Sequence, residues 1–215
     1  MANVKLIWVT PDAEKLVVKM ARVSNPKNEN NWETGPGLLR YSLKNKHFSI
    51  FEMANMTVEI ETTRAISPQI LRHRSFSFQE FSQRYADTNE LGSAVIPHLR
   101  RQDNKNRQNS IDDIPMEMLG NYYRRISELY ENSEHLYREM VSNGIAKECA
   151  RSVLPLSTQT RLFMNGTLRS WIHYLDLRCS NGTQLEHQQI AREIKQIFCK
   201  QFPIIGEAAF SVTQP

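Results

Sequence analysis

The densest group of chemically useful side chains in this sequence is the segment from Arg72 to Tyr85. Its 14 residues include three arginines, one histidine, three serines and one glutamate. The planar guanidinium of arginine suits phosphate groups and the paired acceptor atoms of a pyrimidine ring. The segment therefore predicts a site for an anionic ligand, while a basic surface helix exposed to solvent is the competing interpretation.

Three polar residues alternate at the end of this segment. If residues 80–84 are extended, Glu80, Ser82 and Arg84 point to the same side, because the side chains of a strand alternate. Together they would offer a carboxylate, a hydroxyl and a guanidinium to one small polar ligand. A strand that faces solvent explains the same pattern equally well.

A second arginine site is predicted at Arg151, which interrupts the mostly apolar residues 149–156. A partly buried guanidinium needs a carboxylate or phosphate partner, because an unpaired charge is costly to remove from water. Arg151 is therefore expected either to form a structural ion pair, which is the commoner case, or to bind an anionic ligand.

Residues 167–176 are predicted to form an amphipathic helix. Arg169, His173 and Asp176 recur at helical spacing and share one face. The opposite face is apolar and consists of Leu168, Trp171, Ile172 and Leu175. Solvent exposure by itself explains the polar stripe, and the attraction of a cation to the carbonyl end of a helix explains Arg178.

A shorter pattern, Ser49-x-x-Glu52, follows His47. Ser and Glu at this spacing are typical of a capping box, in which each side chain satisfies a backbone N–H group at the start of a helix. We interpret these two residues as a helix start when they are considered alone.

Several common catalytic motifs are missing from the sequence. There is no Gly-rich phosphate loop, so a nucleotide cofactor would have to be held in another way. There is no Gly-x-Ser-x-Gly elbow of a serine hydrolase. The histidines and cysteines show no HExxH or paired metal-ligand spacing. We therefore expect neither metal catalysis nor a hydrolase triad.

The composition is that of a globular protein of 215 residues, with 40% hydrophobic and 23% charged residues. The formal net charge of +4 is small, so it permits anionic ligands without requiring a nucleic acid. The three cysteines form no CxxC pattern, which favours a reducing compartment. The N-terminal residues do not resemble a signal peptide, and no apolar run reaches membrane-spanning length. We expect a soluble, cytoplasmic protein.

The hydrophobic pattern predicts strands and helices mixed along one compact domain, residues 1–215. Strands are expected at residues 4–9, 56–61 and around 161–165. Helices are expected at residues 12–23, 38–46, 116–140, 167–176 and 184–201. A loop is expected at residues 25–36, and a loop or insertion is expected at residues 100–110, which are almost wholly polar. The fold class is therefore α/β or α+β, with a central sheet flanked by helices.

One more short helix is expected to begin at Ser67, with Ser67 as the N-cap and Pro68 in the first helical position. In such a helix Gln69, Arg72 and His73 stand at i, i+3 and i+4 and share one face. The helix would therefore present an amide, a guanidinium and an imidazole together.

In their order and spacing these segments resemble the flavin-dependent thymidylate synthases, from His47 to the C-terminal helix. The family's Gln-x-x-Arg-His-Arg motif matches residues 69–74, and its Glu-x-Ser-x-Arg motif matches residues 80–84. Its Ala-Arg-x-Val-Leu-Pro motif matches residues 150–155, and its Leu-x-Leu-Arg motif matches residues 175–178.

The resemblance implies an enzyme that makes dTMP from dUMP. Methylenetetrahydrofolate would supply the carbon, and NADPH would supply the reducing equivalents through FAD, with no metal. The resemblance also implies a homotetramer whose active sites are shared between subunits. Its partners would be these small molecules, and neither a nucleic acid nor a membrane.

The resemblance assigns roles to individual residues of this sequence. It implies that dUMP is bound by Gln69, Arg72, Glu80, Ser82, Arg84, Arg151 and Arg178. It implies that FAD is bound by Ser49, Arg72, His73, Arg74, Glu80, Thr167, Arg169 and His173, with Thr167 at a position often held by Asn. His47 would lie beside the flavin and the folate. Arg178 would be catalytic, because a cation near N3 and O4 of the pyrimidine would stabilise the developing anion.

Two other functions remain open at this point. Arginines interleaved with Phe76, Phe78 and Phe81 are also typical of a nucleic-acid-binding module, although the small net charge argues against it. A relative that keeps the flavin and has lost the synthase activity is the other alternative. Arg178 and the Glu-x-Ser-x-Arg motif favour the active enzyme.

Overall fold

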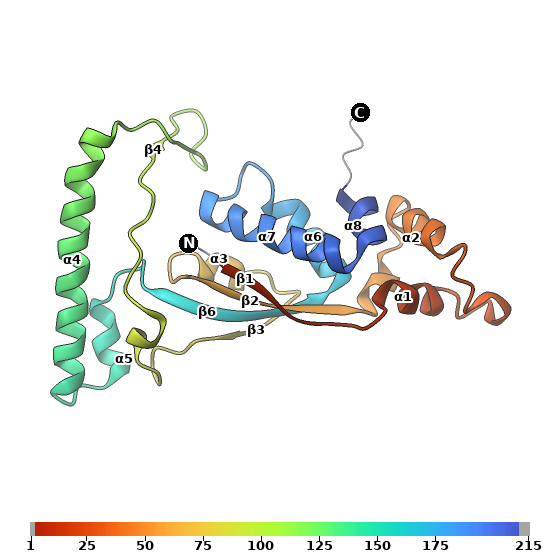
Figure 1. Ribbon diagram of the computed structural model, residues 1–215, viewed down its shortest axis with the longest axis horizontal. Coiled ribbons are helices and arrows are strands. Elements are labelled where there is room, and N and C mark those ends of the chain that lie inside the picture. Colours follow the sequence, from red (N-terminus) through yellow and green to blue (C-terminus); the bar gives the residue numbers. More distant parts are fainter. Residues whose placement is uncertain (1–2, 211–215) are drawn as a thin grey trace.

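The computed structural model describes residues 3–210, which are built around a four-stranded antiparallel sheet (Figure 1). The strand order is β1-β2-β6-β3. The strands are β1 (Asn3–Val9), β2 (Asn55–Thr63), β6 (Gln159–Thr167) and β3 (Ser77–Glu80). The arrangement is α+β, as predicted.

The two central strands, β2 and β6, pair along their full lengths, and their side chains alternate between a buried and a more exposed face. Val58 lies opposite Met164, and Ile60 lies opposite Leu162, all on the buried face. The apolar residues at every second position therefore define the face that the helices cover.

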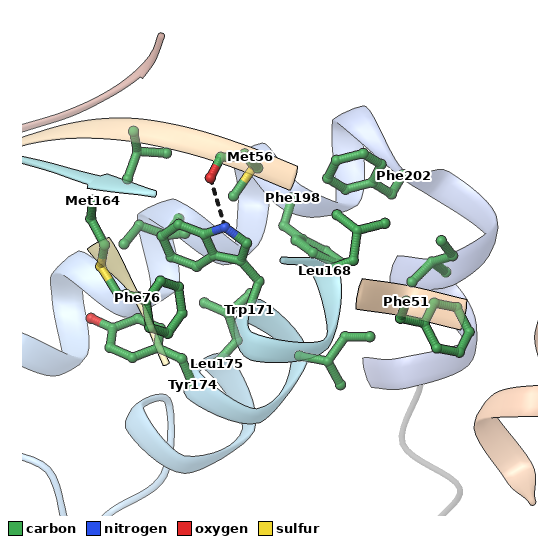
Figure 2. Close-up of a cluster of buried hydrophobic side chains, with 14 of the residues drawn as sticks. Phe51, Met56, Phe76, Met164, Leu168, Trp171, Tyr174, Leu175, Phe198 and Phe202 are labelled. Atoms are coloured by element: carbon green, nitrogen blue, oxygen red, sulfur yellow. Dashed lines mark hydrogen bonds between the residues drawn. The ribbon is translucent and has the colours of Figure 1, made fainter. Parts of the chain in front are cut away.

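Helices cover this face of the sheet (Figure 1). Over the sheet lie α6 (Leu168–Arg178) and α7 (Leu185–Gln201), while α8 (Pro203–Phe210), α1 (Ala13–Ala21) and α2 (Gly35–Lys44) lie at one end of it and add their apolar residues to the same core. The fully buried Trp171 of α6 donates a hydrogen bond from Nε1 to the backbone oxygen of Met56 at 2.9 Å (Figure 2). This bond satisfies the indole N–H while the ring fills the core.

A close approach between β6 and the aromatic core depends on Gly166. A Cβ atom at this position would lie 2.4 Å from Cδ1 of Phe76. Phe76 in turn packs edge-on against Trp171, with ring centroids 4.7 Å apart (Figure 2). Only glycine leaves room for the Phe76 ring at this point.

The helix α4 (Met116–Ser142) stands apart from the other helices, at the end of the sheet where α5 (Lys147–Ala150) also lies (Figure 1). Gly144, with φ of 83°, follows the end of α4, where a left-handed residue favours glycine. Tyr122, Leu129 and Leu136 remain exposed on α4 although the helix is amphipathic.

The remaining elements are short. They are α3 (Ser67–Leu71), the hairpin of β4 (Arg101–Gln102) and β5 (Ser110–Ile111), and the 3-10 helices η1 (Pro26–Asn28), η2 (Phe48–Glu52), η3 (Thr88–Leu91) and η4 (Arg151–Val153). Within residues 3–210 no helix is both long enough and apolar enough to cross a membrane.

Three local predictions were wrong. Helix α3 has Ile66 as its N-cap, the buried Ser67 hydroxyl has no partner among the described residues, and the helix ends at Leu71 before Arg72 and His73. Residues 80–84 are not one strand, because β3 ends at Glu80 and the Ser82 carbonyl accepts hydrogen bonds from Tyr85 N and Ala86 N in a turn. Ser49 and Glu52 form no capping box, since they lie in η2, which has no side-chain cap.

The polar segment at residues 100–110, predicted to be a loop or insertion, contains most of the short β4–β5 hairpin. Gln102 pairs with Ser110, and Asp103 accepts hydrogen bonds from Lys105 N at 2.7 Å and Asn106 N at 3.2 Å. A polar sequence can close such a turn because its side chains satisfy the backbone donors.

Candidate active site

Arg178 lies at the C-terminus of α6 and is held by a histidine from the Arg-His-Arg segment. Its Nε donates a hydrogen bond to His73 Nε2 at 2.8 Å. Because His73 Nε2 accepts, the imidazole is neutral and carries its proton on Nδ1. Burial, followed by the charge of Arg178 and the proximity of His173, lowers the pKa of His73 to about 4. The imidazole therefore stays a hydrogen-bond acceptor at neutral pH.

Gln69 is joined to the start of α7. Its Nε2 donates to Gln184 Oε1 at 2.7 Å, and Gln184 Nε2 donates to Glu186 Oε2 at 2.9 Å. Glu186 also forms an ion pair with Arg100 at 2.7 Å, in which the Arg100 side chain is only 10% exposed. Burial raises the pKa of Glu186, but the hydrogen bonds from Arg100, the backbone and Gln184 together with the charge of Arg100 outweigh it and leave the pKa below the usual range. Arg100 thus fixes the hairpin segment to the element that contacts Gln69.

Glu80, Ser82 and Arg84 are not aligned along one strand, and all three have partners within the chain, since Ser82 Oγ accepts a hydrogen bond from Arg84 N at 3.4 Å. Glu80 pairs with Arg64 at 2.7 Å and accepts a hydrogen bond from Thr160 Oγ1 at 2.9 Å. Arg84 Nε lies 3.1 Å from Glu148 Oε2, in a pair whose side chains are 53% and 52% exposed. An ion pair this exposed contributes little to stability, so a phosphate group could replace Glu148 at small cost.

Arg151 follows α5 and lies close to the segment that contains Arg84, since Lys147 of α5 donates to the Tyr85 carbonyl at 3.1 Å. The part of the chain that the structure describes offers no ion pair to Arg151, Arg72 or Arg74. The structural ion pair considered for Arg151 is therefore not formed within residues 3–210. These three guanidinium groups have the charge that an anionic ligand needs.

The polar face of α6 borders a cavity of about 1250 Å³. Thr167, Arg169, His173 and Asp176 line it from α6 and its N-cap, opposite residues of α2 and α8. The cavity is large enough for a sizeable cofactor. Its lining carries both charges, because Arg40 pairs with Glu207 at 2.8 Å and Arg169 pairs with Glu52.

Thr167 has a structural role at this cavity. Its hydroxyl is the N-cap of α6 and accepts a hydrogen bond from Ser170 N at 3.2 Å. The same hydroxyl donates to Ser170 Oγ at 3.2 Å. An asparagine side chain could also cap the helix, so the threonine preserves the local structure at this position.

The structure thus distributes the predicted residues over three neighbourhoods. Thr167, Arg169 and His173 line the cavity, and exposed Ser49 and His47 lie on or beside η2, which contributes Phe48 and Glu52 to the same cavity. Gln69, His73 and Arg178 gather near the start of α7, and Ser82, Arg84 and Arg151 gather near α5. His173 contributes to the lowered pKa of His73, so α6 connects the first two neighbourhoods.

Sequence reasoning missed several residues of these neighbourhoods. Arg40 and Lys44 have the i, i+4 spacing of one helix face and line the cavity, and this spacing was a usable signal. Glu207 belongs to α8, which was not predicted. Arg100, Glu186 and the buried pair Tyr174 and His187 have no motif that singles them out, because their contacts join distant segments.

Comparison with known proteins decides the family. Residues 5–204 match the model of a family described as thymidylate synthase complementing protein. The chain is 53% identical over 214 residues to a probable flavin-dependent thymidylate synthase of Paramecium bursaria Chlorella virus 1, covering 96% of this chain and 98% of the viral protein. The chain belongs to the flavin-dependent thymidylate synthase family.

Two further members of this comparison extend the result. A flavin-dependent thymidylate synthase of Synechocystis sp. is 51% identical over 195 residues, covering 91% of this chain and 88% of that protein. A crystal structure of a UMP/dUMP methylase PolB from Streptomyces cacaoi, bound with 5-Br dUMP, superimposes with a TM-score of 0.85 at 27% identity, covering 97% and 94% of the two chains. The predicted family and enzyme class, a flavin-dependent thymidylate synthase, are confirmed.

The described residues are not arranged for metal catalysis, and two of the three cysteines are not activated as nucleophiles. Within residues 3–210 no group of three or more His, Cys, Asp or Glu side chains is placed to hold a metal ion. Burial raises the pKa values of the Cys179 and Cys199 thiols, which disfavours the nucleophilic thiolate.

Proposed function

We propose that this flavin-dependent thymidylate synthase converts dUMP to dTMP with FAD as its flavin, NADPH as reductant and methylenetetrahydrofolate as carbon donor. The observation that carries the proposal is the hydrogen bond from Arg178 to His73, which joins two family motifs at one end of α6. It supports a site in which a fixed guanidinium faces the substrate ring.

For FAD we propose the cavity beside α6 and the exposed arginines next to it. The cavity's volume and the cationic groups along its border fit a large anionic cofactor. When bound, the flavin supplies the redox chemistry. The residues that would hold it are Ser49, Arg72, His73, Arg74, Glu80, Thr167, Arg169 and His173, with His47 beside the flavin and the folate.

For dUMP we propose binding by Gln69, Arg72, Glu80, Ser82, Arg84, Arg151 and Arg178. Arg151 has no carboxylate partner among residues 3–210, and Arg84 has only an exposed one, so both are suited to the phosphate group. Gln69 is oriented by Gln184, and its amide is suited to the polar edge of a base.

We propose that Arg178 is the catalytic residue. Its Nε is occupied by His73, which leaves the two terminal nitrogens of the guanidinium to donate hydrogen bonds to the pyrimidine. Charge that develops on N3 and O4 of the ring would then be stabilised by a cation that is already oriented.

We also propose a homotetramer of single-domain subunits, residues 1–215, with active sites shared between subunits. No hydrogen bond or ion pair within residues 3–210 links the group at α5 with the group at α7, although both are assigned to dUMP. Tyr122, Leu129 and Leu136 leave an apolar stripe on α4, 50%, 64% and 45% exposed, that a second subunit could cover. Light scattering that shows an active monomer would contradict this assembly.

The proposed reaction is tested by assembling it from purified components. dTMP formation is measured with dUMP, methylenetetrahydrofolate, FAD and NADPH, and each component is omitted in turn. UMP is offered as a second substrate, because the structural relative from Streptomyces cacaoi is a UMP/dUMP methylase. We expect dTMP only in the complete mixture. Flavin-loaded protein that reduces flavin but never forms dTMP would overturn the proposal. The setting we propose is the cytoplasm, with small molecules as partners and neither nucleic acid nor membrane.

A further inference from the structure

A histidine outside the family motifs is buried behind the proposed catalytic arginine. His187 of α7 is 0% exposed, and its Nε2 lies 3.0 Å from the hydroxyl oxygen of Tyr174 in α6, which is also 0% exposed. His187 Nδ1 has no hydrogen-bond partner among the described residues. Two polar groups in an apolar core cost free energy that a pair of apolar side chains would not, so their position next to the site requires an explanation.

The pair forms one wall of the space that holds His73. The ring of Tyr174 meets the ring of His73 edge-on, with centroids 4.8 Å apart and planes at 82°. The His187 ring lies 6.4 Å from His73 at 81°. Tyr174 sits among the core aromatic rings, beside Phe76 and one helical turn from Trp171 (Figure 2). Rotation of the Tyr174 ring would therefore remove the surface against which His73 packs.

A continuous series of contacts leads from the buried His187 to Arg178, the residue proposed to face the substrate. His187 holds the Tyr174 hydroxyl, Tyr174 packs against His73, and His73 accepts the hydrogen bond from Arg178 Nε. We propose that Tyr174 and His187 are positioning residues for Arg178: their hydrogen bond fixes the orientation of His73 and thereby the direction of the Arg178 guanidinium. This inference rests on the proposed catalytic function of Arg178.

The protonation of His73 is part of the same arrangement. The charged and titratable groups that face it are Arg178, His173 and Tyr174 from α6 and His187 from α7. Burial and the charge of Arg178 lower the pKa of His187 to about 4, with His73 as a smaller cause. Both imidazoles are therefore neutral at pH 7, and neither repels Arg178.

The test uses the Tyr174→Phe variant of the FAD-loaded enzyme. This substitution removes one hydroxyl group and keeps the aromatic ring. The matched control is Tyr137→Phe, because Tyr137 is a buried tyrosine of α4 whose hydroxyl has no partner in the described part of the chain. For Tyr174→Phe we expect normal FAD content and a roughly two- to tenfold slower single-turnover flavin oxidation with dUMP and methylenetetrahydrofolate, the effect of one lost hydrogen bond. Tyr137→Phe should leave this rate unchanged.

A structural role alone would not alter the pH profile, so the profile is measured as well. Without the hydrogen bond to His187, the Tyr174 ring is free to move away from His73. Water then reaches His73, and its pKa rises towards the usual value. The rate of Tyr174→Phe should then fall at a higher pH than the wild-type rate as the solution is acidified, because protonated His73 cannot accept from Arg178. The double variant Tyr174→Phe/His187→Phe should be no slower than Tyr174→Phe alone, since the two residues act as one unit.

Two outcomes would overturn the inference. One is a Tyr174→Phe enzyme with the wild-type rate and pH profile and only a lower melting temperature. The other comes from the wild-type holoenzyme and needs no variant: histidine NMR that shows His73 protonated on Nε2, or titrating near its usual pKa. If wild-type protein forms no dTMP while His73 shows the expected tautomer, the proposed function fails and the positioning of Arg178 stands.

Discussion

Arg178 and His73 are 105 residues apart in the sequence and are joined by a hydrogen bond of 2.8 Å. The histidine of the Arg-His-Arg segment is thus not simply one more positive charge in a basic cluster. Its neutral ring accepts the Nε–H of Arg178, while the flanking Arg72 and Arg74 remain exposed. The three residues of this segment therefore have two different tasks: the two arginines supply charge, and the neutral histidine orients a third cation, Arg178.

Replacing Arg178 with lysine should separate charge from geometry. Lysine keeps the charge but has neither the Nε–H that His73 accepts nor a planar fork for the pyrimidine. We expect Arg178→Lys to retain FAD and much of its affinity for dUMP, and to oxidise reduced flavin far more slowly with dUMP and methylenetetrahydrofolate. Single-turnover absorbance at saturating substrate measures this rate, with Arg192→Lys on the exposed side of α7 as the control. A near-normal rate would leave Arg178 with a binding role only.

Removing Arg151 or Arg84 should mainly weaken dUMP binding. Loss of one charge-assisted contact costs about 1.5–3 kcal/mol, which is roughly ten- to a hundredfold in affinity. Titration calorimetry with dUMP measures the change in Arg151→Ala and Arg84→Ala. Glu148→Gln is the matched control, because it removes the carboxylate that competes for Arg84 and should leave dUMP affinity unchanged or raise it. Unchanged dUMP affinity together with loss of FAD would show that these arginines bind the other ligand.

The buried His187 should make the protein less stable in acid. Its pKa is lowered to about 4, chiefly by burial, whereas an unfolded histidine titrates near 6.5. Between these values the unfolded chain binds the extra proton, so the stability that is present above about pH 6.5 is lost as the pH falls towards 4. In His187→Phe this dependence should be shallower by about 1.4 kcal/mol per pH unit within the window. Urea unfolding at fixed protein concentration measures it.

The exposed His135 provides the comparison for that experiment. His135→Phe makes the same substitution at an exposed position and controls for the replacement of a histidine by phenylalanine as such. If the curves of wild type and His187→Phe run parallel from pH 6.5 to 4.5, then His187 does not titrate differently on folding and the prediction is wrong.

Arg100 should control the mobility of the β4–β5 hairpin. In Arg100→Ala the partly buried Glu186 loses its ion pair, at a local cost of about 1–3 kcal/mol, and Gln184 loses a fixed neighbour. We expect faster hydrogen exchange across residues 101–111 and weaker dUMP binding through Gln69. Arg101→Ala is the control, since the partner of Arg101 is Asp113 and the arginine side chain is 60% exposed. Equal exchange rates in the two variants would contradict the role assigned to Arg100.

The main elements of the fold could be predicted because each has its own periodicity. The alternation in β2 follows directly from the sequence, and the three- and four-residue repeats of α4, α6 and α7 predicted their extents to within a few residues. The apolar face of α6 is buried as expected, and its polar stripe borders the cavity. Solvent exposure and ligand binding had both explained that stripe, and the adjacent cavity favours the second.

The errors arose where tertiary contacts override local pattern. Ser82 reads as the middle of a strand, but its carbonyl accepts hydrogen bonds from Tyr85 N and Ala86 N and the chain turns. Glu52 reads as half of a capping box, but its carboxylate pairs with Arg169, which is 117 residues away. A local pattern cannot predict which partner the Glu52 carboxylate will take, because a nearby backbone N–H and the distant Arg169 guanidinium would each satisfy it.

Gly166 gives a strand of the sheet an influence on the proposed active site. The ring of Phe76 occupies the position where any other residue would place its first side-chain carbon. Phe76 follows His73 by one turn of chain, and its ring lies 6.5 Å from the His73 ring and 5.8 Å from the Tyr174 ring. A methyl group added at Gly166 would displace the Phe76 ring, and this displacement would shift the His73 imidazole that orients Arg178. The empty space of a single hydrogen atom, on the face of the sheet that the helices cover, is part of the alignment of the proposed catalytic cation.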